Sequence, residues 1–155
     1  MDNPLWQYSL DVYRREGVEP LLLKLQDECG LDVNVLLYAA WLGGQGIALT
    51  EAHCGVVLQA TEEWRSSVVT PLRELRRQLR GIDAAEAVRE RVKGLELESE
   101  AEVQRLLYES YCSAYLTPDG GTVAGNLTQA AAAGQSAPDA PSQSLLDALA
   151  SLLTV

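Results

Sequence analysis

The segment from Leu25 to Gly44 constrains the fold of this chain more than any other, because it combines a helix end, a cap and a strongly apolar helix. Gly30 lies where a helix commonly ends with a residue in the left-handed conformation. Asp32 follows as an N-cap, since its carboxylate can accept the free amide hydrogens of the next helix. The helix predicted over residues 33–42 is apolar on nearly every side, and such a helix must be covered all round. We therefore expect it to be the central element of a helical domain.

Capping residues and apolar spacing predict further helices around this element. Asn3 and Pro4 form an N-cap and a first helical position, and Thr70 and Pro71 suggest a second start of that kind. Capping-box spacing follows Asp83 and Ser99. The expected helices span residues 4–16, 20–29, 33–42, 50–79 with a kink near 66–70, 84–93 and 100–116. These segments predict an all-α fold, a compact bundle of about five to six helices.

The character of the chain changes after Leu116, where Gly, Ala, Ser, Gln and Pro become frequent. Such a composition offers little apolar surface to offset the loss of chain entropy on folding. We therefore expect three parts: a helical domain over residues 1–116, a disordered linker over 117–143 and a short amphipathic helix over 144–155. The helix at the end would be unstable alone at this length.

Composition limits the classes of protein to which the chain can belong. A hydrophobic fraction of 47% in 155 residues suffices for one domain with a proper core. The longest apolar runs are too short or too interrupted to cross a bilayer, which needs about 20 apolar residues. The acidic start lacks the pattern of a secretion signal, so we expect a cytoplasmic protein with no membrane association. Three widely spaced cysteines predict free thiols in that compartment.

Several short motifs carry a resemblance to a known family. They are Asn3-Pro4-Leu5-Trp6, the run Leu25-Gln26-Asp27-x-x-Gly30-x-Asp32-Val33-Asn34, and Ala40-Trp41-Leu42. In these residues the chain resembles a family of short uncharacterised proteobacterial proteins of unknown function, over about residues 3–115. The resemblance implies a compact helical domain and no particular activity.

Four arginines provide the first functional hypothesis. Arg73, Arg76, Arg77 and Arg80 are spaced by three and four residues, which predicts one shared helical face. A net charge of −10 makes direct nucleic-acid binding unlikely, yet residues 65–93 hold eight basic and four acidic side chains, a local +4. Guanidinium groups suit bidentate recognition of anions. The face therefore either binds an acidic protein or ribonucleoprotein partner, or is a solvated face paired with Glu74 and with acids of neighbouring helices.

The polar turn between residues 26 and 34 provides the second hypothesis. Its side chains could serve as caps and structural partners, contact another protein, or offer oxygen ligands to a divalent cation. Capping is the simplest explanation, because the spacing matches no recognised calcium loop. A ligand pocket here could also use Trp41 and the tyrosines of the last predicted helix of the domain. The candidate residues are Gln26, Asp27, Asp32, Asn34 and Trp41.

Motifs of catalysis and metal binding are missing from the sequence. His53 and Cys54, with two distant cysteines, lack the paired spacings of structural zinc sites. Neighbours on a helix point about 100° apart, so His53 is badly placed to activate Cys54. We predict no metal and no cofactor. Whether the chain is an enzyme stays open, although the missing motifs favour a protein without enzymatic activity. The first hypothesis is a small interaction or adaptor module that uses its Arg face. The alternative is a helical domain that binds a small ligand or a metal around Asp27–Asn34, with or without enzymatic activity.

Overall fold

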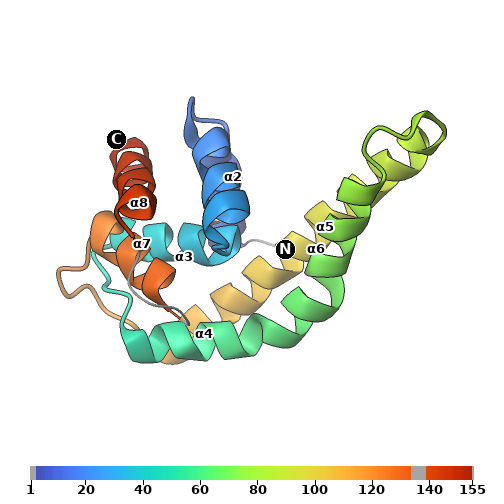
Figure 1. The fold of residues 1–155 in the computed structure, drawn as a ribbon. Coiled ribbons are helices and arrows are strands. Elements are labelled where there is room, and N and C mark those ends of the chain that lie inside the picture. The colour runs from blue at the N-terminus through green and yellow to red at the C-terminus, as the bar shows by residue number, and fades with distance from the viewer. Residues whose placement is uncertain (1–2, 134–138, 155) are drawn as a thin grey trace.

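The structure, a computed structural model, describes residues 3–133 and 139–154, and within these ranges it contains helices and no strand. Figure 1 shows a body built from both ends of the chain and a long helical hairpin that projects from it. The α-helices are α1 (Pro4–Tyr13), α2 (Val18–Cys29), α3 (Val33–Gly44), α4 (Glu51–Trp64), α5 (Thr70–Gln78), α6 (Glu86–Ala114), α7 (Val123–Ala132) and α8 (Ala140–Leu153). The predicted all-α class is confirmed, although the helices are more numerous than the five or six expected.

Helix α3 occupies the centre of the body. Nine of its twelve residues are buried, as expected for a helix that is apolar on every side. The preceding turn has the predicted caps: Gly30 adopts the left-handed conformation with φ 68°, and Asp32 Oδ1 accepts a hydrogen bond from the Val35 amide at 3.1 Å. These local interactions fix where α2 ends and where α3 begins.

The expected disorder over residues 117–143 is not confirmed. Helix α7 lies within that range and packs against α3, and Leu127 is fully buried there (Figure 1). Small residues make this possible, because they let two backbones meet where larger side chains would collide. A Cβ atom at Gly121 would clash with the backbone of Ala48. The sequence argument counted large apolar side chains and so missed close packing by small ones; residues 134–138 lie outside the described residues.

Asn126 locks α7 onto the loop that follows α3. Its Oδ1 accepts from the Leu49 amide at 2.8 Å, and its Nδ2 donates to the carbonyl oxygens of Ala39 and Ile47 at 3.1 and 2.8 Å. Asn126 is only 3% exposed, so water cannot replace these bonds. The side chain therefore pairs with three backbone groups, two of which, the Leu49 amide and the Ile47 carbonyl, belong to the loop after α3.

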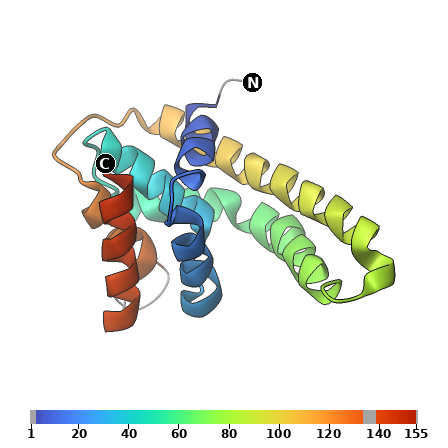
Figure 2. The ribbon, with the colours of Figure 1, turned by 90° about the horizontal axis from the view of Figure 1, so that it is seen from above.

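Helix α8 covers the other side of the body, against α2 and α7 (Figure 2). It begins at Ala140, four residues before the predicted start, with Asp139 as its N-cap. Leu146, Leu149 and Leu153 are its buried leucines. The amphipathic helix expected at this end of the chain is thus present, and it packs on the rest of the body.

The projecting hairpin consists of α4 and α5 on one side and α6 on the other (Figures 1 and 2). The kink predicted near residues 66–70 is a π-helical turn, Arg65–Val69, through which the helix continues into α5. Thr70 makes no side-chain cap, because its backbone angles are helical (φ −60°, ψ −47°) and the helix runs on through it. We call residues 70–99, the distal part of this hairpin, the arm.

A single helix of 29 residues, α6, replaces the two helices predicted over 84–93 and 100–116. Ser99 is not a cap, because its hydroxyl donates to the Glu96 carbonyl at 2.7 Å within the helix. Its own carbonyl accepts from the Trp64 indole at 2.8 Å, which ties α6 to α4. No helix among the described residues combines the length and the apolar character required to span a membrane.

The role of Asn126 leads to a stability prediction. We expect Asn126→Ala to lower the free energy of unfolding by about 2–4 kcal/mol, because it leaves buried backbone groups of the loop after α3 without partners. Urea unfolding followed by circular dichroism measures this change. Gln129→Ala is the matched control, since that α7 side chain is only partly buried and makes no hydrogen bond in the described part of the chain. Equal effects of the two substitutions would contradict the role given to Asn126.

Candidate functional site

The arginines of the predicted face lie in different environments. Arg73 and Arg76 both bond to Glu96 on α6: Arg76 Nε lies 2.5 Å from Glu96 Oε1, and Arg73 Nε lies 3.4 Å from Oε2. Arg73 also reaches Glu100 at 3.3 Å. The Glu96 side chain is only 10% exposed, so this ion-pair network is largely withdrawn from water. It clamps α5 against α6.

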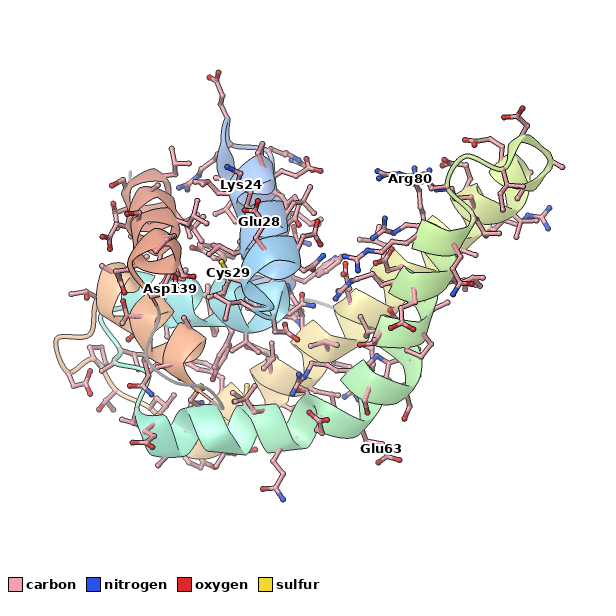
Figure 3. All side chains as sticks on the ribbon, in the orientation of Figure 1. Lys24, Glu28, Cys29, Glu63, Arg80 and Asp139 are labelled. Atoms are coloured by element: carbon pink, nitrogen blue, oxygen red, sulfur yellow. The ribbon has the colours of Figure 1, made fainter. Side chains whose placement is uncertain are left out.

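Arg77 and Arg80 lie closer to solvent. Arg77 Nη2 pairs with Asp27 Oδ1 at 2.6 Å and so connects α5 to α2, with both side chains about half exposed. Arg80 is exposed at the end of α5 (Figure 3) and has no ion pair within residues 3–133 and 139–154. Three of the four arginines therefore have intramolecular partners, which are Glu96, Glu100 and Asp27 and not Glu74. Binding of a partner by this face stays a prediction.

Glu100 and Tyr13 lie beside this network and have perturbed pKa values. Burial raises the pKa of the Glu100 carboxyl, the charge of Glu96 raises it further, and Arg73 opposes both. Burial, with the charges of Glu100 and Glu19, raises the pKa of Tyr13 to about 12. The sequence did not single out these residues, because their interactions depend on how α1 and α6 meet.

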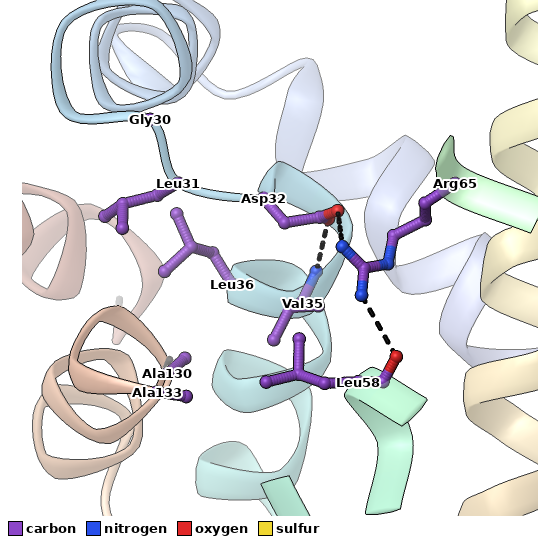
Figure 4. Close-up of a pocket in the computed structure, with 9 residues that line it drawn as sticks. All are labelled: Gly30, Leu31, Asp32, Val35, Leu36, Leu58, Arg65, Ala130 and Ala133. Carbon is purple, nitrogen blue, oxygen red and sulfur yellow. Dashed lines mark hydrogen bonds and ion pairs between the residues drawn. The ribbon is translucent and has the colours of Figure 1, made fainter. Parts of the chain in front are cut away.

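The turn before α3 has a structural role at Asp32 (Figure 4). While Oδ1 caps α3, Oδ2 lies 3.5 Å from Arg65 Nη1. Arg65 also donates to the Leu58 carbonyl at 3.0 Å, so it links this turn to α4. Arg65 and Asp32 line a hollow of about 180 Å³. In the described ranges, no three His, Cys, Asp or Glu side chains are grouped so that they could hold a metal ion.

Asn34 leaves the turn and enters the interior of the body. Ser9 Oγ donates to Gln104 Oε1 at 2.9 Å, and Gln104 Nε2 donates to Asn34 Oδ1 at 3.0 Å. This buried chain joins α1, α6 and α3. It also forms part of a cavity of about 380 Å³ between the same helices.

The other candidates of the turn are dispersed. Gln26 is partly buried on α2 and makes no side-chain hydrogen bond within the described residues. Trp41 packs edge-on against Tyr111 and Tyr108, with ring centroids 4.7 and 5.9 Å apart. Tyr115, by contrast, is 88% exposed. Asp32, Asn34 and Trp41 thus belong to three separate clusters and do not form one site.

His53 and the cysteines are also apart from one another. His53 Nε2 lies 2.7 Å from the Tyr38 hydroxyl in the core, and burial lowers the pKa of His53. Burial raises the pKa of the neighbouring Cys54 thiol, which makes a thiolate less accessible. Cys29 is partly buried beside Ser142, and Cys112 is exposed. The described positions offer neither a thiol–imidazole pair nor a zinc set.

The Glu96 network generates a second prediction. We expect Glu96→Gln to lower the free energy of unfolding by about 1–3 kcal/mol, because it removes the charge that pairs with two partly buried guanidinium groups. Chemical unfolding measures this change. Glu98→Gln on the exposed side of the same helix is the control and should change stability little. An unchanged unfolding midpoint for Glu96→Gln would show that the clamp contributes no stability.

A comparison with protein families bears out the resemblance noted in the sequence. The family described as "Protein of unknown function (DUF2390)" matches residues 4–107. No curated protein and no solved structure was found to match. The matched range contains α1 to α5 and most of α6, whereas α7 and α8 lie beyond it. Because the match covers more than half of the chain, this protein belongs to the DUF2390 family of proteins of unknown function.

Proposed function

We propose that this protein is an interaction module that binds an acidic segment of a partner protein through its arm. One observation carries the proposal: five of the eight large hydrophobic side chains that are exposed in the described residues lie on the arm. They are Leu75, Ile82, Val88, Leu95 and Leu97, each between 41% and 53% exposed. Exposed apolar side chains gathered on one projection are typical of a docking surface.

The architecture of the arm supports this function. No residue of α5 is fully buried, so its packing on α6 leaves apolar surface uncovered. The arm projects away from the body, where a partner can reach it (Figures 1 and 2). A hydrophobic surface on a projecting hairpin costs solubility, and a partner that covers it removes that cost.

Exposed arginines on the arm favour an acidic partner. Residues 65–93 carry a net +4 in a chain of net −10. The arm itself, residues 70–99, holds seven basic and six acidic side chains, so its charge would not keep two arms apart. An acidic segment would nevertheless meet complementary charge at the arginines that lack an ion pair. Arg80 and Arg91 are exposed and have no ion pair in the described ranges, so both are available to carboxylates of such a segment. Arg73 and Arg76 contribute less directly, since Glu96 already holds them.

Two matched pairs of substitutions test the proposal. Arg80→Glu and Ile82→Ser change the charge and the apolar surface of the arm without touching the Glu96 clamp. Lys24→Glu on α2 (Figure 3) and Val56→Ser on α4 make the same chemical changes on exposed side chains outside the arm. We expect each arm variant to reduce recovery of the partner in affinity purification by about tenfold, and each control to leave it unchanged.

Nuclease treatment and sedimentation separate the alternatives. The proposal is supported if mass spectrometry identifies a partner protein that stays bound after nuclease treatment. The segment of that partner that the complex protects should be acidic. Loss of the partner on nuclease treatment would mean that nucleic acid bridges the complex. Concentration-dependent self-association lost in Ile82→Ser would assign the arm to a second copy. Equal recovery with arm and control variants would refute a role for the arm.

A further inference from the structure

The cavity between α1, α3 and α6 has the features of a small-molecule site. Its volume is about 380 Å³, enough for a ligand with one aromatic ring. Trp6, Leu10 and Leu37 provide apolar walls, and the Ser9–Gln104–Asn34 chain provides polar atoms. It shares only Leu97 with the exposed apolar residues of the arm, so it is a site distinct from the proposed docking surface.

Asn34 presents to this cavity a donor that has no partner among the described residues. The residue is 6% exposed, and its Oδ1 accepts from Gln104, whereas its Nδ2 donates to no atom of the described residues. No fully buried side-chain nitrogen or oxygen in the described part of the chain lacks a partner, so this Nδ2 must be accessible. The accessible space beside it is the cavity that Asn34 lines. Water can reach this atom, and an acceptor atom on a ligand would take the place of that water.

The charges at the cavity favour a cation. Glu19 and Glu100 line it together with one arginine, Arg14, and within the described ranges Glu100 bonds to one cation, Arg73. Burial raises the pKa of Tyr13, and the charges of Glu100 and Glu19 raise it further while Arg73 opposes them, as expected where the two carboxylates lie near this cavity residue. The rings of Trp6 and Tyr13 add faces that attract positive charge.

We propose that this cavity binds a small organic amine with an apolar body and a hydrogen-bond acceptor. The carboxylates of Glu19 and Glu100 attract the ammonium group. The apolar body packs against Trp6 and Leu37. The acceptor takes the free amide hydrogen of Asn34. Each of these contacts uses a group that the cavity already presents.

Tyramine is a suitable probe, because it combines an ammonium group, an aromatic body and a phenol oxygen. Tyrosol replaces the ammonium with a hydroxyl and is the neutral match. We would titrate each into the nitrogen-15-labelled full chain up to about 10 mM, the range in which such small ligands bind. The expected result is a saturable shift of the Asn34 side-chain amide with tyramine and a much weaker one with tyrosol.

Substitutions at the carboxylates complete the test. Glu19→Gln should weaken tyramine binding by about threefold and Glu100→Gln by about tenfold, because Glu100 is the more buried. Glu16→Gln is the control, because it removes an exposed carboxylate of the α1–α2 connection that does not line the cavity. It should leave tyramine binding unchanged. Equal binding of tyramine and tyrosol would overturn the preference for a cation. The absence of any saturable shift would overturn the site, while leaving the proposal for the arm intact.

Discussion

The need to bury α3 on all sides is the constraint on which the rest of the structure depends. A helix that is apolar all round gains stability only when every face is covered, at about 1.5–3 kcal/mol for each large side chain buried. Helices α1, α2 and α6 cover part of it, and α7, which lies beyond the family match, packs on what remains. The body is thus assembled from segments far apart in sequence. The distal part of the arm, where α5 packs on α6, projects from this body (Figure 1).

Polar groups inside the body determine how these helices fit together. Asn126 pairs with the backbone around α3, the Tyr38 hydroxyl meets His53, and the Ser9–Gln104–Asn34 chain joins three helices. Buried polar groups are expensive without partners, and the Asn34 donor, which meets only the cavity, is the one that a ligand acceptor can bind. On the arm the uncovered groups are apolar side chains, whose exposure to water is unfavourable and points to a partner protein. The two proposals therefore rest on different kinds of unsatisfied surface.

Sequence reasoning predicted the features that depend on neighbours along the chain. Asn3 and Asp32 are N-caps as expected, and Gly30 is left-handed, because capping involves only three or four residues. The caps expected at Thr70 and Ser99 are absent, because the helices continue through both positions. It failed where distant segments decide the outcome. The partners of Arg73 and Arg76 come from α6, 20 to 27 residues away, and the docking of α7 depends on close backbone contact at Gly121. The cavity of the further inference was missed for the same reason, since only Asn34 of its lining had been singled out.

Native-state hydrogen exchange tests the central claim that α3 organises the body and leaves the arm separate. The account predicts that the amides of α3 and α7 exchange most slowly and respond together to denaturant, since one cannot be exposed without the other. Those of α5 should exchange faster through local opening, because none of its residues is fully buried. Rapid exchange of α7 while α3 remains protected would contradict the account, because it would show that α3 does not need this cover.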